Sequence, residues 1–308
     1  MFLGLGLGPI SIVTTSVLYA GNGEYAAIAD MLKQPRTSED AINSTLKAFP
    51  NLNYKTAVAI YSQIVQRKVK SSLHKHQKAE MVKCYYEEYV VNSKKDPCGP
   101  VMLNLAMKVD LPPALFARMI LEQHLINSDD NEDENVSKLQ VNQLLKDTHL
   151  IQDPVLSFQV QQAVLNDMTY GPIVESIKHS VGNEYEFLLK SHLKKNNISF
   201  IREEEMRSKG YDKTPDIKLQ IPIAMDGYII NWIESKASFG DKVSQANYLK
   251  DQFWSYVNRF GSGLVIYWFG YIEELDVHRD RGIALAQHFP NSLVTFNPLK
   301  VENRVHNS

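Results

Sequence analysis

Two runs of residues that favour β-strands flank an Asp-Gly pair at positions 226–227, and this pattern restricts the fold more than any other. An Asp-Gly pair between such runs predicts a β-hairpin with a tight turn. The second run, YIINWIESKASF (residues 228–239), is as apolar as a buried strand, yet it carries Glu234 and Lys236 in its middle. An unpaired buried charge is costly, so the fold must supply partners for both side chains.

The pairing register of this hairpin predicts where the two charges lie. Side chains alternate between the two faces of a strand, so Glu234 and Lys236 share one face. If Ala224 pairs with Tyr228, the apolar residues of both strands meet on the other face and Asp216 lies opposite Lys236. A one-residue shift would place the charges on the apolar face. The sequence therefore predicts a three-residue loop or a β-bulge, with Asp216, Glu234 and Lys236 converging on one face.

Two carboxylates and a lysine in this arrangement suit a divalent metal site. The oxygen atoms of Asp216 and Glu234 are hard ligands for Mg²⁺, which keeps several water molecules for a reaction. Such a metal activates water and polarises a phosphate, while Lys236 would orient or deprotonate the water or stabilise negative charge. The alternative is a structural ion pair at the edge of a hairpin, since Glu-x-Lys is a common sequence.

The first twenty residues contain no charged side chain, and the first charge is Glu24. A signal peptide or a single membrane span is one interpretation. Because glycines and Pro9 interrupt the run and no basic segment precedes it, we instead expect an apolar extension over residues 1–23 and no stable membrane association. The two cysteines, Cys84 and Cys98, lack metal-ligand spacing and fit a reducing compartment.

Residues 24–180 place apolar side chains at helical spacing and are predicted to form a helical domain. The stretch QRKVKSSLHKHQK is basic and contains no acid, and its Arg67, Lys68 and Lys70 are candidates for contacts with DNA phosphates. A solvated helix surface explains the same pattern. The net charge of −2 gives no general attraction to nucleic acid, so any such surface must be local.

Residues 101–125, VMLNLAMKVDLPPALFARMILEQHL, predict two helices joined by a tight turn at DLPP. This segment resembles a helix-turn-helix of the AraC type, whose second helix enters the major groove of DNA. Many helical hairpins share the pattern, however, and Asp110 and Glu122 would repel DNA. The acidic stretch at 127–135 is predicted to be a solvated loop.

After Val181 the pattern changes to alternating strands and helices. GLVIYWFGYI (residues 263–272) is a continuous apolar run, typical of a central strand buried on both faces. A helix around IALAQHF and a strand at LVTFN complete the expected sheet. We therefore predict an α/β protein in which residues 181–298 form a mixed sheet flanked by helices, followed by a tail at 299–308.

The combination of Thr-Pro-Asp at 214–216 with Glu-x-Lys at 234–236 resembles the PD-(D/E)xK nuclease superfamily. From about Tyr170 to Phe289 the sequence is similar specifically to the codanin-interacting nucleases, which carry a Thr-Pro-Asp signature. The resemblance implies a restriction-endonuclease-like core and catalytic roles for Asp216, Glu234 and Lys236.

The resemblance also implies further site residues. A glutamate on the helix before the first strand usually follows a glycine by four residues, which matches Glu186 after Gly182, with Glu184 in reserve. Glu186 would then bind the metal together with the two strand carboxylates. Gln252 and Tyr256 resemble the Gln-x-x-x-Tyr motif of RecB-like members and would face the metal site and bound DNA, although core packing of an aromatic helix explains the pair equally well.

The function implied by the resemblance is a Mg²⁺-dependent DNA endonuclease of structure-specific or resolvase-like type, with Mn²⁺ as a substitute metal. The same resemblance implies codanin as a partner, a nuclear and cytoplasmic location and a role in erythroid differentiation. Resolvase ancestry is compatible with a symmetric dimer. Two other classes remain open: a catalytically silent nuclease fold that acts as a binding module through codanin, and a transcription factor based on the helix-turn-helix.

Overall fold

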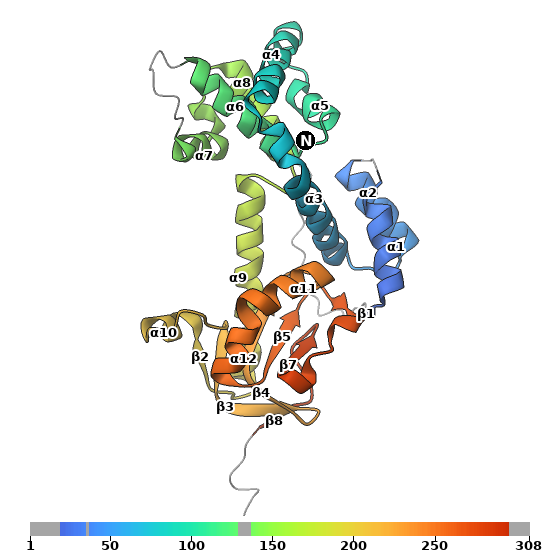
Figure 1. Ribbon diagram of the computed structural model, residues 1–308, viewed down its shortest axis with the longest axis vertical. Helices are drawn as coiled ribbons and strands as arrows, with labels where there is room; N and C mark the ends of the chain where they lie inside the picture. Colours follow the sequence, from blue (N-terminus) through green and yellow to red (C-terminus); the bar gives the residue numbers. More distant parts are fainter. Residues whose placement is uncertain (1–18, 35–36, 129–136, 296–308) are drawn as a thin grey trace, which may run out of the picture. The chain divides into compact units, whose positions relative to one another are not determined.

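The computed structural model of the chain describes residues 19–34, 37–128 and 137–295 (Figure 1). The described residues form two compact units: one contains those before Ile60 and those from Glu186 onward, and the other contains those between Ile60 and Tyr185. The long helices α3 (Tyr54–His76) and α9 (Pro172–Lys195) contribute to both units. The predicted tail, most of the predicted extension and most of the predicted acidic loop lie outside the described residues.

The first unit is built on a six-stranded sheet. Strands β2, β3, β4, β5 and β7 are neighbours in this order, and β8 pairs with β3. Pairing is antiparallel from β2 to β4 and parallel from β4 to β7, so the predicted α/β class with a mixed sheet flanked by helices is confirmed. The strands are β2 (Phe200–Arg202), β3 (Ile217–Met225), β4 (Tyr228–Lys236), β5 (Gly263–Tyr267), β7 (Ile283–Ala286) and β8 (Val294–Thr295).

Strand β5 is buried along its whole length because helices cover both faces of the sheet. Leu264 belongs to the same buried cluster as Leu189 of α9, whereas Val265, on the other face, clusters with Tyr256 of α12. The prediction of a central strand buried on both faces is confirmed. The helical segments that follow β4 are α11 (Lys242–Tyr248), the π-helical turn η2 (Leu249–Phe253) and α12 (Trp254–Phe260) (Figure 1).

The Asp-Gly pair forms the predicted hairpin turn between β3 and β4. Asp226 has a φ of 50° and Gly227 a φ of 80°, and a two-residue type I′ turn requires positive φ at both positions. Met225 pairs with Tyr228, so the predicted three-residue loop and the pairing of Ala224 with Tyr228 are wrong. The shorter loop forms because aspartate and glycine tolerate positive φ better than most residues.

The alternative, a β-bulge, is confirmed farther along the same hairpin. The register changes between Lys218 and Ile223, so that Ile217 pairs with Ile233 at the end away from the turn. Pro222 lies in this irregular stretch, and proline has no N–H to give to a neighbouring strand. As a result Asp216 lies beside Glu234, not opposite Lys236 as predicted.

The helix predicted around residues 283–289 is wrong, because Ile283–Ala286 forms strand β7 parallel to β5. An apolar run of four residues is too short to show either a helical or a strand period. Residues 283–285 are buried, as expected for a strand in a covered parallel sheet. The strand predicted after it is present as β8.

Gly263 at the start of β5 provides a stability test of this sheet. A Cβ atom at Gly263 would lie 2.1 Å from the buried indole of Trp232. We expect Gly263→Ala to lower the free energy of unfolding by about 1–3 kcal/mol, the usual cost of overpacking. Gly182→Ala is the control, because its new Cβ meets no atom within 4 Å in helix α9 and should raise stability by up to about 1 kcal/mol. Urea denaturation measures both variants, and equal effects would contradict the close approach.

The described residues before position 60 belong to the sheet unit. Strand β1 (Tyr19–Ala20) pairs in parallel with β6 (Tyr271–Ile272). Tyr25 stacks on Phe239 with ring centroids 5.7 Å apart. The region predicted as a helical domain, residues 24–180, therefore contributes to both units. Its helices in the sheet unit are α1 (Asn22–Leu32), α2 (Ser38–Ala48) and the start of α3.

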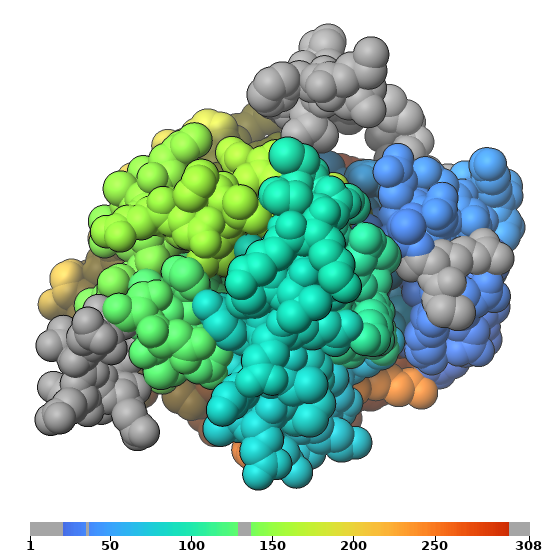
Figure 2. Space-filling view, turned by 90° about the horizontal axis from the view of Figure 1, so that it is seen from above, coloured from blue at the N-terminus to red at the C-terminus, as the bar shows by residue number. Residues whose placement is uncertain are grey.

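The second unit is helical and has its core around α6, which packs against α4, α5 and α8. Figure 2 shows its helices, coloured teal to yellow-green, packed together. Helices α5 and α6 are joined by a tight turn in which Asp110 has a φ of 59°, while a helix-turn-helix that binds DNA stays a prediction. The helices of this second unit include α4 (Ala79–Lys95), α5 (Val101–Lys108), α6 (Pro113–Ser128), α7 (Lys138–Lys146) and α8 (Pro154–Leu165).

In the described part of the chain, no helix is long and apolar enough to cross a membrane.

Candidate active site

The candidate site lies where β3 and β4 meet, at the end of the hairpin away from its turn. Asp216 directly precedes β3, and its backbone N–H donates to Glu234 Oε2 at 3.2 Å. Asp216 Oδ2 accepts from the Ser235 N–H at 2.7 Å, and Lys236 Nζ donates to Glu234 Oε1 at 2.7 Å. The structure thus brings together the three side chains that the sequence predicted to converge.

Lys236 is held by two further contacts. Its ammonium donates to Gln252 Oε1 at 3.0 Å and lies 4.5 Å from the centroid of the Tyr248 ring. An aromatic face attracts a cation placed over it. Gln252 belongs to the π-helical turn η2, and such turns occur frequently at functional sites. The sequence motif identified Gln252, but nothing in the sequence indicated the π-helical turn or the role of Tyr248.

Burial and like charge dominate the electrostatics of the two carboxylates. Burial raises the pKa of Asp216 well above its usual value, and the charge of Glu234 raises it further. Burial also raises the pKa of Glu234, although Lys236 opposes the rise. Burial lowers the pKa of Lys236, but the charge and hydrogen bond of Glu234 outweigh this effect and the pKa is raised overall. With two acids and one lysine, the cluster carries more negative than positive charge when ionised.

This excess of buried negative charge fits a divalent cation. A metal beside Asp216 and Glu234 would relieve their repulsion, and Mg²⁺ uses one or two carboxylates together with water. Glu186 is half-buried on α9 and its charge contributes to the raised pKa of Asp216, whereas Glu184 is exposed, which favours Glu186. Glu186 Oε2 also accepts from Lys190 Nζ at 3.2 Å. Within the described ranges, no three His, Cys, Asp or Glu side chains are grouped to hold a metal ion by themselves.

Tyr256 packs in the core, as one of the two interpretations predicted, while a contact with bound DNA stays a prediction. Its ring is buried and packs edge-on against Trp232, with centroids 5.3 Å apart, so it is part of the core. Burial raises the pKa of Tyr256, and the charges of Glu234 and Asp216 raise it further, so its hydroxyl lies within the field of the site. Of the predicted pair, Gln252 contacts Lys236, whereas Tyr256 packs against Trp232 of the sheet.

Glu203 is a site neighbour that the sequence did not reveal. It opens the short helix α10 (Glu203–Ser208), forms an ion pair with Arg207 at 2.6 Å and accepts from Thr214 Oγ1 at 3.3 Å. Its charge also contributes to the raised pKa of Glu234. The only sequence signal was the run of three glutamates at 203–205, which alone indicates a solvated helix start.

The basic residues Arg67, Lys68 and Lys70 lie on α3 in the helical unit and are not part of this cluster. Lys68 forms an ion pair with Asp110 in the turn before α6. Arg67 Nε donates to the Gln63 carbonyl at 3.1 Å. The basic segment of α3 contains no acid in its sequence, but the fold places Asp110 beside it. Contact of Arg67, Lys68 and Lys70 with DNA stays a prediction.

The fold and the site together define a class of protein. A mixed sheet flanked by helices, with Pro-Asp before one strand and Glu-x-Lys at the end of its hairpin partner, is the arrangement of the PD-(D/E)xK nuclease superfamily.

Comparison with known proteins identifies the family of the chain. Residues 152–289 match a family described as "Protein of unknown function TPD sequence-motif". The protein named CDAN1-interacting nuclease 1 in Xenopus tropicalis is 45% identical over 283 residues, which are 92% of each chain. Its namesake in Homo sapiens is 46% identical over 272 residues, 88% of this chain and 96% of the human one. The chain belongs to the CDAN1-interacting nuclease 1 family. No solved structure matches it.

Proposed function

We propose that this protein is a metal-dependent DNA endonuclease that hydrolyses phosphodiester bonds. The observation that carries the proposal is the cluster of Asp216, Glu234 and Lys236, in which the buried Glu234 carboxylate accepts from the Lys236 ammonium and from the backbone N–H of Asp216. The name of the relatives, which contains the word nuclease, supports the same activity.

In the proposed reaction, the acidic residues bind the metal and Lys236 acts on the phosphate. Asp216 and Glu234, with Glu186 as the third candidate, would hold Mg²⁺ or Mn²⁺. When bound, such a metal polarises the phosphate and activates water. Lys236 already donates hydrogen bonds to Glu234 and Gln252, which leaves one of its three N–H groups for a phosphoryl oxygen. We therefore assign Lys236 to the stabilisation of negative charge on the reacting phosphate.

We further propose codanin as a partner, because the relatives are named for an interaction with CDAN1. A nuclear and cytoplasmic location and a contribution to erythroid differentiation complete the proposal. Imaging of the tagged protein in erythroid precursor cells tests the location, and failure to enter the nucleus would exclude a role on chromosomal DNA.

The activity is tested with purified protein and labelled single-stranded, duplex, flap and four-way-junction DNA. We expect cleavage with Mg²⁺ or Mn²⁺ and none with EDTA, and the most rapidly cut substrate defines the preferred DNA shape. Asp216→Ala and Lys236→Ala proteins are the controls. Cleavage that survives in both variants would show that the cluster is not the active site.

A second candidate is a catalytically silent binding module that acts through codanin. One observation favours it: both oxygens of Glu234 already accept hydrogen bonds from the protein, from Lys236 Nζ and from the Asp216 N–H. A carboxylate satisfied in this way can serve structure alone. Absence of cleavage on all four DNA shapes, with codanin binding intact in Asp216→Ala, would establish this candidate.

A further inference from the structure

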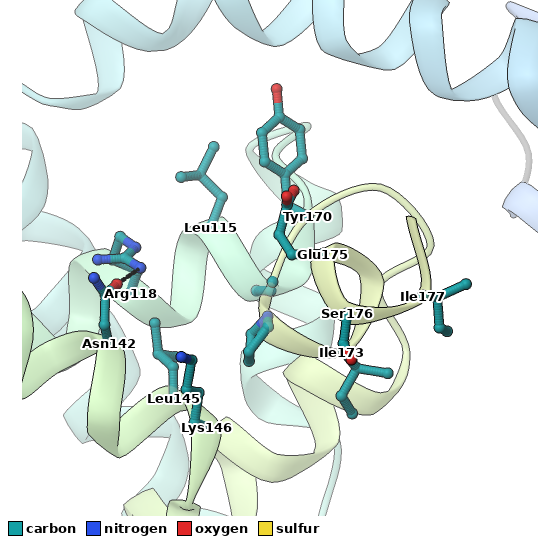
Figure 3. A pocket seen from close by; sticks show the side chains of 13 residues that line it. Leu115, Arg118, Asn142, Leu145, Lys146, Tyr170, Ile173, Glu175, Ser176 and Ile177 are labelled. Atoms are coloured by element: carbon teal, nitrogen blue, oxygen red, sulfur yellow. Dashed lines mark hydrogen bonds between the residues drawn. The ribbon is translucent and has the colours of Figure 1, made fainter. Parts of the chain in front are cut away.

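The helical unit contains an open cavity of about 850 Å³ that the proposed nuclease reaction does not use (Figure 3). Helices α6 and α7 and the first turns of α9 form its walls. Its volume falls within the range of roughly 300–1,000 Å³ that is common for binding sites. The lining residues that matter here are Leu115, Arg118, Leu145, Lys146, Ile173 and Ile177, and we call the cavity the α6–α7–α9 groove.

Apolar side chains around this groove are exposed to solvent. Ile173 is 41% exposed and Ile177 is 52% exposed, and their spacing of four residues puts them on one face of α9. Leu145 of α7 lines the same cavity and is buried. Exposed apolar residues gathered around a hollow mark an interaction site more often than single ones do.

The polar part of the groove is basic. Figure 3 shows Arg118 and Lys146 on the side formed by α6 and α7, across from Ile173 and Ile177. The Arg118 guanidinium donates to Asn142 Oδ1 and lies 3.7 Å from a Glu122 oxygen, which fixes its direction.

The remaining charges leave this wall positive. Lys146 is exposed and forms no ion pair with any described residue. Glu175, the acid among the lining residues, lies 3.8 Å from Lys178. A partner segment that is apolar on one side and carries an acidic side chain would therefore complement the groove.

We propose that the α6–α7–α9 groove binds one amphipathic helix of the partner protein. Its apolar face would lie against Leu115, Ile173 and Ile177, and an acidic side chain would meet Arg118 and Lys146. The unit has no β-strand in its described residues, so strand addition is excluded and anchors at helical spacing are the matching mode. The partner protein is codanin, so this inference rests on the proposed codanin partnership. The groove would be the surface on this protein that codanin binds.

The test uses full-length protein and purified codanin, with the dissociation constant measured by biolayer interferometry. We expect Ile177→Glu to weaken binding more than about tenfold, because it places a charge in the apolar centre of the interface. Val91→Glu is the matched control: Val91 is 53% exposed on α4, outside the groove, and its replacement should leave the constant within about twofold. Circular dichroism confirms that both variants fold.

A second pair of variants tests the basic wall. Lys146→Glu should slow association and weaken binding by about threefold or more, and this effect should shrink in high salt. Lys83→Glu, at an exposed lysine of α4, should change neither the association rate nor the dissociation constant. On codanin binding, amide exchange should slow in residues 138–146 and 172–177.

The outcomes separate the groove from the partnership. If the wild-type protein does not bind codanin, both the partnership and the groove assignment fail. If the wild type binds and Ile177→Glu binds equally well, the groove assignment is overturned while the partnership stands. Equal weakening by Ile177→Glu and Val91→Glu would also overturn the assignment, because the loss would not be specific to the groove.

Discussion

Asp216→Asn is expected to lower the rate of metal-dependent DNA cleavage by about a thousandfold or more. The change keeps the size of the side chain and an oxygen able to accept from the Ser235 N–H, but removes one of the two carboxylates of the cluster. A thousandfold loss corresponds to about 4 kcal/mol of transition-state stabilisation, within the range for a group that acts through a bound metal. Asp226→Asn is the control, because Asp226 lies in the exposed hairpin turn, where asparagine is equally favourable. Equal cleavage by wild type and Asp216→Asn would contradict the proposed site.

The same variant has two readouts that do not depend on cleavage. Mg²⁺ or Mn²⁺ should raise the melting temperature of the wild type, since a ligand that binds only the folded state stabilises it, and this rise should be lost in Asp216→Asn. Without metal, the raised pKa of Asp216 means that the folded state keeps this proton to higher pH than the unfolded state. The free energy of unfolding of the wild type should therefore fall as pH rises above about 4, and this fall should be smaller in the variant.

Lys236→Met is expected to reduce both activity and stability. Cleavage should fall by about a hundredfold or more, because the ammonium that would stabilise the reacting phosphate is gone. The free energy of unfolding at pH 7 should fall by about 3 kcal/mol, since Glu234 is left buried without its counter-charge. Loss of Lys236 also raises the pKa of Glu234 further. The stability deficit should therefore be largest at neutral pH and should shrink on acidification as Glu234 becomes protonated.

A double variant separates the structural role of this pair from its chemical role. Glu234→Gln together with Lys236→Met removes both charges, so most of the stability lost in Lys236→Met should return. Activity should stay absent, because neither the metal ligand nor the cation is restored. Urea denaturation and the cleavage assay give the two values. A double variant that cleaves DNA would exclude these residues from catalysis, and one as unstable as Lys236→Met would show that the buried charge is not the cause.

The sequence predicted the central part of the site because the signals there are local. Asp226-Gly227 fixed the hairpin, and the cost of burying Glu234 and Lys236 required a partner, which led to Asp216. The exact residue pairing between β3 and β4 could not be predicted, because an irregular stretch containing Pro222 changes the register midway along β3. A register counted from the turn therefore fails at the other end of the strand.

The features that the sequence did not predict depend on contacts between distant residues or on short segments. Strand β7 is an apolar run of four residues whose strand character comes from pairing with β5. The π-helical turn that presents Gln252 has no sequence signal of its own. The ion pair between Lys68 and Asp110 exists only because the fold brings α3 to the turn before α6.

The sheet unit is made from both ends of the described chain, and this has a consequence for its synthesis on the ribosome. Tyr25 stacks on Phe239, and its hydroxyl donates to Asp241 Oδ2 at 3.5 Å, 216 residues away in sequence. At about 5–20 residues per second, translation takes roughly 10–40 s to deliver these partners. The helical unit, continuous over residues 60–185, emerges complete in the meantime. During this time the nascent chain carries the whole helical unit together with the N-terminal helices of the sheet unit. The apolar faces of those N-terminal helices stay exposed to chaperones until the last strands of the sheet are synthesised.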